Sequence, residues 1–239
     1  MGVGCGVVRS LIGNTEINVD FIPVDFVCNT LITAAWSNSF IKSKTIPVYH
    51  SSSGQLNPVK MTYMAETFRK YSTIYPTKNI LWRPSYSYTT NISVHCIKQI
   101  LYHFLPALIY DMVLRMQNKK PFMFRMAQRY QGDAEMGTFF TMHQWNFDGK
   151  NICSLLKVAK DTQLDANEFN FDISGLDWNE YFKQYWLGIR KFIFKEDLSS
   201  LPQARKKLQQ FIWMSRIIQM IFISLGAYYL FETFKHFFT

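Results

Sequence analysis

Three alternating glycines near the start of the chain are the first residues whose type and spacing could do chemistry. Gly2, Gly4 and Gly6 are similar to a phosphate-binding loop, in which glycines let the backbone approach a nucleotide closely. A dinucleotide fingerprint has the spacing Gly-x-Gly-x-x-Gly between a strand and a helix. Here Val7 stands where the third glycine belongs, and no strand precedes the run. We therefore predict no cofactor-binding loop in this chain.

His95 and Cys96 are a second candidate, because these residue types bind metals or act as a base and a nucleophile. Adjacent residues on a helix do not face each other, however. None of the five histidines lies three or four residues from another, and no Cys-x-x-Cys pair occurs. We predict no metal site, and we interpret His143 as a structural residue.

Two further catalytic patterns are missing from the sequence. Short-chain reductases use a Tyr-x-x-x-Lys pair as proton donor, but none of the thirteen tyrosines has a lysine four residues later. No Gly-x-Ser-x-Gly elbow marks a nucleophilic serine. We therefore predict no catalytic residue within this chain.

The composition limits the class of protein that this sequence can form. In 239 residues, 48% are hydrophobic and only 18% are charged, which excludes a disordered protein. The aromatic content of 17% suits a large core, a membrane interface or both. The cysteines are too far apart to form a disulfide framework, so we expect free thiols in a reducing compartment. They are Cys5, Cys28, Cys96 and Cys153.

The net charge of +9 is concentrated in two blocks, each beside an apolar stretch. Residues 98–129 hold six basic residues and one acid, and residues 183–216 hold eight basic residues and two acids. Nucleic acid, an anionic membrane and the phosphates of coenzyme A all attract such charge, and solvated helix faces also contain it. The neighbouring apolar stretches favour the membrane, and we predict no nucleic-acid partner.

The first part of the chain has an α/β pattern. Strand-like runs at residues 17–22 and 45–50 flank a predicted helix at 26–36, with Asp25 as its N-cap. A second helix is expected from Asn57-Pro58 to Tyr71, because proline is favoured at the first helical position. This order predicts the edge of a parallel sheet.

Three later stretches are predicted helices. Residues 97–116 are apolar but contain Pro106 and two charges, so we expect a core helix or one lying on a membrane. Residues 177–194 show helical spacing of aromatic residues after an Asp177–Glu180 capping pair, which predicts a helix packed by its aromatic face. The last helix is expected over 202–231.

The last predicted helix has the features of a membrane segment. Residues 217–231 are free of charge, and Arg216 lies near enough to one end to reach the interface. Trp213 and Tyr228-Tyr229 stand where interfacial anchors belong. We predict membrane association, by spanning or by lying in the interface.

Several motifs together resemble the eukaryotic fatty acyl-CoA reductases of the insect type. Gly6 to Trp36, with Ile-Pro-Val-Asp at residues 22–25, Asn29 and an Ala-rich helix ending in Trp36, is similar to the end of their reductase domain. The later motifs resemble their C-terminal, male sterility-type domain. These are H-F-L-P-A (103–107), Trp145-Asn146-Phe147, F-N-F-D-I (169–173), Asp177-Trp178…Tyr181 and Gly188-Ile189-Arg190-Lys191. Cys5 stands where family members often have lysine.

The resemblance implies a fold and an activity. Residues 1–50 would be the remnant of a Rossmann-like reductase domain, 51–96 a connecting region, 97–196 the male sterility-type domain, and 202–231 a basic helix running into a membrane segment. The family reduces long-chain acyl-CoA to a primary alcohol with NADPH. Its glycine loop and Tyr-x-x-x-Lys pair lie upstream of the Ile-Pro-Val-Asp segment, so the isolated chain is expected to be inactive.

The resemblance also places residues and partners. The Ile-Pro-Val-Asp segment would lie near the substrate cavity, which makes Ile22, Val24 and Asp25 candidate cavity residues. The structural alternatives are that Asp25 caps a helix and that Ile22 and Val24 belong to the core of the sheet. Long-chain acyl-CoA and a membrane are the implied partners, at the cytosolic face of the endoplasmic reticulum or peroxisome. The other hypothesis is a non-catalytic membrane protein that binds acyl chains or partners the enzyme.

Overall fold

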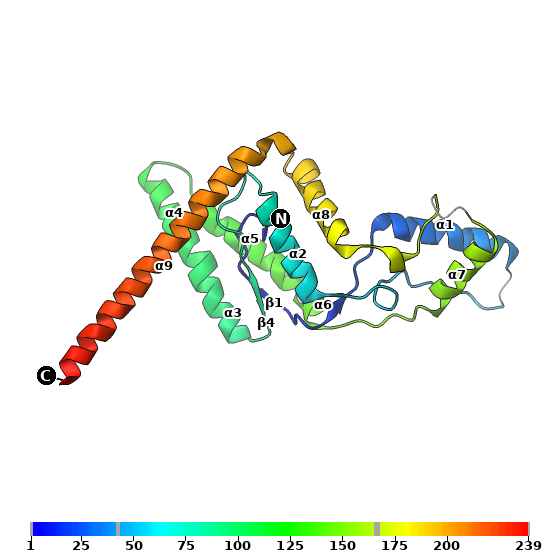
Figure 1. Ribbon diagram of the computed structural model, residues 1–239, viewed down its shortest axis with the longest axis horizontal. Coiled ribbons are helices and arrows are strands. Elements are labelled where there is room, and N and C mark those ends of the chain that lie inside the picture. The colour runs from blue at the N-terminus through cyan, green and yellow to red at the C-terminus, as the bar shows by residue number, and fades with distance from the viewer. Residues whose placement is uncertain (1, 42–43, 165–167, 239) are drawn as a thin grey trace.

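The computed structural model describes residues 2–41, 44–164 and 168–238, and it is mainly helical and elongated (Figure 1). Helices α1 and α7 lie at one end, while α3, α4 and α9 lie at the other. The nine α-helices of the described residues are α1 (Val24–Phe40), α2 (Met61–Ile74), α3 (Ile92–Gln99), α4 (Leu105–Met116), α5 (Met123–Met136), α6 (Thr138–Met142), α7 (Lys150–Asp161), α8 (Trp178–Gly188) and α9 (Leu201–Phe238).

The strands in the described residues form two small pairs. β1 (Ser10–Ile12) is parallel to β4 (Ser87–Thr89), and β2 (Asn18–Val19) is antiparallel to β3 (Val59–Lys60). The prediction of strands at residues 17–22 and 45–50 was therefore largely wrong: only two of residues 17–22 pair, and residues 45–50 form no strand. A strand-like run needs a neighbouring strand whose backbone groups form hydrogen bonds with its own, and the described residues contain few such strands.

The starts of the first two helices also differ from the prediction. Pro23 is the N-cap of α1, and Asp25 lies inside the first turn, where its Oδ1 accepts the N–H of Phe26 at 3.1 Å. The predicted cap by Asp25 was therefore wrong, although its charge still suits a helix N-terminus. Helix α2 begins at Met61 rather than at Pro58, because Val59 and Lys60 pair with β2 first.

The main hydrophobic core lies between α8 and α2. Phe182, Trp178 and Val59 are buried there together with Ile173, and Phe68 of α2 packs against Phe182 with ring centroids 5.0 Å apart. The predicted aromatic helix is thus confirmed through α8, and Asp177 caps it by accepting the N–H of Asn179. The end of the prediction was wrong, because residues 189–193 form a π turn in which Phe192 is 73% exposed.

Residues 92–116 form one continuous helical rod. A π turn at Ile100–Phe104 joins α3 to α4. Pro106 follows it, and proline has no N–H to donate to the preceding turn, which favours a local change of helical geometry there. Asp111 connects the rod to α5: its carboxylate accepts the backbone N–H groups of residues 122–124 at 2.9–3.0 Å.

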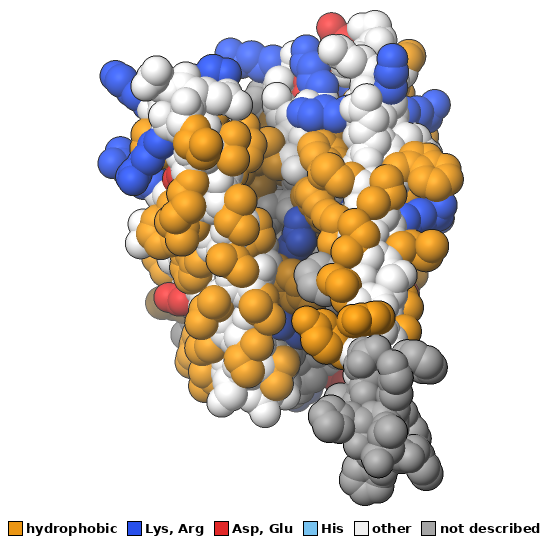
Figure 2. Space-filling model, turned by 90° about the vertical axis from the view of Figure 1, so that its left-hand side faces the viewer, with side chains coloured by type: hydrophobic (Ala, Val, Ile, Leu, Met, Phe, Trp, Pro, Cys, Tyr) orange, Lys and Arg blue, Asp and Glu red, His pale blue; other side chains and the backbone are white. Residues whose placement is uncertain are grey.

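The rod and α9 are the two described helical stretches long and apolar enough to cross a membrane. They cross near the same end of the molecule, and Figure 2 shows hydrophobic side chains along both. Helix α9 is longer than predicted. It begins at Leu201, where Ala204 and Leu208 are buried against the rest of the protein, and runs to Phe238.

Candidate functional site

The glycine run near the start of the chain is a packing device. A Cβ on Gly4 would overlap the indole of Trp186, and a Cβ on Gly6 would overlap the carbonyl of Trp82. Gly6 also has a φ of 74°, in the left-handed region that favours glycine. Close approach of the segment to α8 and to the Trp82 loop therefore accounts for these glycines.

His95 lies in a buried chain of polar groups rather than beside Cys96. Its Nδ1 is 2.9 Å from Ser10 Oγ, and its Nε2 is 3.2 Å from Gln131 Nε2, which donates to Glu135. The arrangement is similar to a serine, histidine and acid, but Ser10 is 0% exposed, so no substrate can reach its hydroxyl. Cys96 is exposed, as expected for a neighbour on a helix. The network is structural.

The predicted cavity residues do not come together around a pocket. Ile22 packs, partly buried, against the core of α8 and α2. Val24 is 76% exposed, which contradicts its alternative as sheet core, and Asp25 is exposed. None of the three lines either of the spaces described next.

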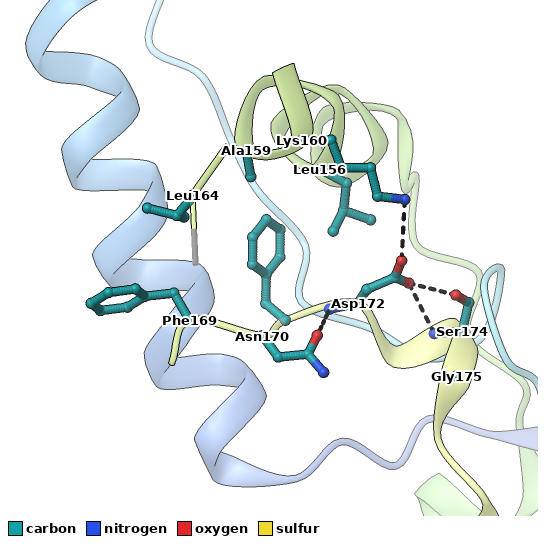
Figure 3. Close-up of a pocket in the computed structure, with 10 residues that line it drawn as sticks. Leu156, Ala159, Lys160, Leu164, Phe169, Asn170, Asp172, Ser174 and Gly175 are labelled. Carbon is teal, nitrogen blue, oxygen red and sulfur yellow. Dashed lines mark hydrogen bonds and ion pairs between the residues drawn. The ribbon is translucent and has the colours of Figure 1, made fainter. Parts of the chain in front are cut away.

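A shallow pocket lies between α7 and the loop at residues 169–175 (Figure 3). Its volume is about 330 Å³, and one wall is the aliphatic face of α7. The polar wall is Asp172, which accepts from the hydroxyl and N–H of Ser174 and pairs with Lys160 at 3.6 Å. Burial raises the pKa of Asp172, but these partners outweigh it and lower the pKa overall. Because Lys160 already pairs with the Asp172 carboxylate, this pocket offers no free charged group for catalysis.

A larger cleft separates the rod at residues 92–116 from α9. Its apolar part has a volume of about 420 Å³. Ala107 and Tyr110 come from the rod, Met123 from α5, and Phe211 and Met214 from α9. The rings of Trp82 and Phe211 are in tilted contact, with centroids 5.7 Å apart. Figure 2 shows this face, on which a furrow with basic side chains inside it runs between two apolar columns.

The cleft continues into a polar part of about 360 Å³ that is rich in cations. Arg9, Arg83 and Lys98 line it, and Lys98 Nζ donates to Ser87 Oγ at 3.1 Å. None of these three cations forms an ion pair with a carboxylate in the part of the chain that the structure describes. Ser215 of α9 lines the same part, and its buried Oγ has no hydrogen-bond partner among the described residues.

Arg9, Trp82 and Tyr102 line both parts and therefore form the junction between them. The Arg9 guanidinium lies 4.9 Å from the centroid of the Trp82 ring, and its Nε donates to the carbonyl of Gly6 at 3.4 Å. The backbone N–H of Arg9 donates to Nε2 of His103 at 2.8 Å, which fixes the segment against the rod. Burial lowers the pKa of Arg9, yet guanidinium stays charged in proteins.

This arrangement suits binding rather than bond making. An apolar cavity next to unpaired cations can hold an amphiphilic molecule with a negative head group. Among the described residues, no group of three histidine, cysteine or acidic side chains could hold a metal. The sequence patterns did not single out Arg9, Trp82 or Arg83, because no periodicity marks loop residues that meet two distant helices.

Comparison with known proteins shows what this chain resembles. Residues 102–196 match the family described as male sterility protein. The chain is 33% identical to fatty acyl-CoA reductase 2 of Mus musculus over 211 residues, or 88% of this chain and 40% of that protein. It is 27% identical to a fatty acyl-CoA reductase of Drosophila melanogaster over 237 residues, or 99% of this chain and 46% of that protein.

A putative fatty acyl-CoA reductase of Drosophila melanogaster is 28% identical over 228 residues, which are 93% of this chain and 44% of that protein. The chain is therefore similar to fatty acyl-CoA reductases over most of its length, as its motifs predicted. It spans less than half the length of these curated relatives. Their names do not favour the alternative of a non-catalytic binding protein.

Proposed function

We propose that this chain is the C-terminal portion of a fatty acyl-CoA reductase, in which it handles the acyl group and anchors the enzyme. The observation that carries the proposal is similarity to named reductases over 88% or more of the chain, together with the male sterility match at residues 102–196. Residues 1–50 would be the edge of a Rossmann-like reductase domain, 51–96 a connection, 97–196 the male sterility-type domain, and 202–231 the basic helix and membrane segment.

The proposed reaction is the reduction of a long-chain acyl-CoA to a primary alcohol by two molecules of NADPH. NADPH bound to the rest of the enzyme would supply one hydride for each of the two reductions. The first would release coenzyme A as the thiol and leave an aldehyde, and the second would give the alcohol, with one proton taken up in each. No residue described above supplies the hydride or the proton. This chain's part would be to place the acyl group. Ile22, Val24 and Asp25 line none of the spaces described above, so their place near the substrate rests on the family resemblance alone.

The membrane is the proposed location of the enzyme. The described side chains in the charge-free stretch of α9 are solvent-exposed, and the rod at residues 92–116 presents further apolar side chains on the same face. Large exposed apolar patches mark contact surfaces, and basic residues beside them favour an anionic bilayer. We place the protein on the cytosolic side of the endoplasmic reticulum or the peroxisome, where NADPH and acyl-CoA are available.

A chimera tests the proposal. The segment of mouse fatty acyl-CoA reductase 2 that aligns with this chain is replaced by residues 1–239, and membranes containing the chimera receive palmitoyl-CoA and NADPH. We expect hexadecanol from the chimera, and none from residues 1–239 alone or from the mouse enzyme without its segment. A chimera that is membrane-bound and folded but forms no alcohol contradicts the assignment.

A further inference from the structure

We propose that the cleft between the rod at residues 92–116 and α9 binds one long acyl chain that carries an anionic head group. The chain would lie in the apolar part beside Ala107 and Phe211, and the head group would lie against Arg9 and Lys98. The identity of this ligand as an acyl group rests on the proposed function, whereas the binding test below does not need the reductase activity.

The shape of the cleft supports a ligand with two chemically different ends. Its two parts, of about 420 and 360 Å³, each fall within the range of about 300–1,000 Å³ that ligand pockets occupy. The apolar part is lined mainly by aromatic and aliphatic side chains, together with Arg9, His103 and Lys207. The lining of the other part includes three basic residues. Arg9, Trp82 and Tyr102 line both parts, so the two spaces adjoin. In this proposal one molecule extends from one space into the other past these three side chains.

The charge of the polar part selects the head group. Arg9 is half-buried, its one side-chain hydrogen bond within the described chain is the long one to Gly6, and no carboxylate pairs with it there. A partly buried guanidinium favours an anion that satisfies its remaining N–H groups. The unpartnered Ser215 Oγ is a further donor on the α9 side. A carboxylate and the phosphates of coenzyme A share this chemistry, and the two sources are separated by competition.

The position of the cleft gives the ligand a route from a bilayer. The rod and α9, which form its two sides, are the apolar helices that face solvent at one end of the molecule. A lipid can therefore pass between two membrane-facing helices without crossing water. This arrangement distinguishes the cleft from the pocket beside α7, which lies at the opposite end.

Photolabelling tests the site directly. The full chain in phosphatidylcholine vesicles is irradiated with a photoreactive palmitate analogue, and labelled peptides are mapped by mass spectrometry. We expect label on residues 98–110, on residues 207–214, and on the loop around Trp82, which is residues 75–86 between α2 and β4. Excess palmitate should remove this label if a free carboxylate is the head group, and palmitoyl-CoA should remove it more effectively if phosphates are. Hexadecanol, which has no charge, should compete weakly.

Two pairs of variants separate the chain-binding and head-binding parts. Arg9→Gln keeps the backbone N–H that bonds to His103 but loses the charge, and we expect about tenfold weaker labelling by the anionic probe. Lys157→Gln, at an exposed position on α7, is its control. Ala107→Trp fills the apolar part and should abolish labelling, while Ala35→Trp on the exposed face of α1 should not. Circular dichroism melting confirms that each variant is folded.

Three outcomes overturn the inference. Label spread evenly over the exposed faces of both helices, with no competition by palmitate or palmitoyl-CoA, shows contact with bulk lipid only. Unchanged labelling of folded Arg9→Gln contradicts the head-group assignment even if Ala107→Trp fails to fold. A chimera that makes alcohol while its cleft takes no label supports the reductase function and rejects this binding site. Specific label on the cleft of an inactive chimera supports the binding site and rejects the reductase function.

Discussion

Gly4 and Gly6 show how a residue pattern can suggest chemistry while serving packing. The spacing failed the dinucleotide fingerprint, and the structure gives the physical reason for the glycines: the backbone passes against Trp186 and against the Trp82 carbonyl. The glycine spacing alone did not reveal these contacts, because both partners lie far away in the chain. Asp25 differs, because its place inside the first turn follows from a neighbour: Pro23, two residues earlier, is the N-cap of α1.

Gly4→Ala tests this packing. The added methyl group overlaps the indole of a fully packed Trp186, so we expect a loss of about 1–3 kcal/mol in the free energy of unfolding. Gly132→Ala is the matched control, because nothing lies within 4 Å of its added Cβ in the middle of α5. There alanine should stabilise the helix by up to about 1 kcal/mol. Denaturant unfolding of both variants measures the difference, and equal stabilities would contradict the packing role.

The thiols differ in their predicted reactivity. Cys5 is buried, and burial raises its pKa to about 11, so almost no thiolate is present near neutral pH. Cys28 and Cys96 are exposed. At pH 7.5 we expect iodoacetamide to modify Cys28 and Cys96 within the folded protein and to leave Cys5 unmodified until denaturant is added. Mass spectrometry of the peptides measures this, and rapid modification of native Cys5 would show that it is accessible.

At the scale of elements, helices were easier to predict than strands. The aromatic spacing of residues 177–194 identified α8, because every turn of a helix repeats the same local contacts. The strand-like runs failed because a strand depends on a partner elsewhere, and here Asn18 and Val19 pair only with the residues before α2. The π turn at 189–193 interrupts the periodicity, so the predicted aromatic face ended too late.

Helix α8 offers a direct test of its aromatic face. Trp186 is 2% exposed and its Nε1 donates to the carbonyl of Tyr75 at 2.9 Å, while Trp178 donates to the side chain of Asn57. Replacing either tryptophan by alanine should cost about 3–5 kcal/mol. Lys183→Ala should cost well under 1 kcal/mol, because it loses a surface ion pair with Glu180. Comparable melting temperatures for the three variants would contradict this packing.

At the scale of the whole molecule, the distribution of apolar surface is the main finding beyond the sequence. Hydropathy predicted α9 as a membrane segment and residues 97–116 as a core helix or a helix lying on a membrane. The structure keeps His95 and Asp111 of the rod bonded to the protein on one side and leaves its other side apolar and exposed. Only the three-dimensional arrangement brings this face beside α9, because the two helices are separated by some eighty residues of sequence.

Membrane anchoring by α9 is the prediction that belongs to this scale. Arg205, Lys206, Lys207 and Arg216 precede its charge-free stretch, while Lys235 and His236 follow it. Basic residues are retained on the cytoplasmic side, so the body of the protein should lie in the cytosol. Deletion of all residues after Leu208 should release the protein from carbonate-washed membranes. Deletion of residues 232–239 alone is the control and should not.

The orientation has its own measurement, because two sites report on opposite sides of the bilayer. A glycosylation acceptor appended after Thr239 should be modified if α9 spans the membrane, and should stay unmodified if the helix lies in the interface. Asn91 begins a natural acceptor sequence, but its side-chain oxygen caps α3 and the prediction places it in the cytosol. Glycosylation at Asn91 would therefore reverse the orientation. Retention of the protein truncated after Leu208 would instead assign membrane binding to the exposed face of the rod, since that face remains when α9 is removed.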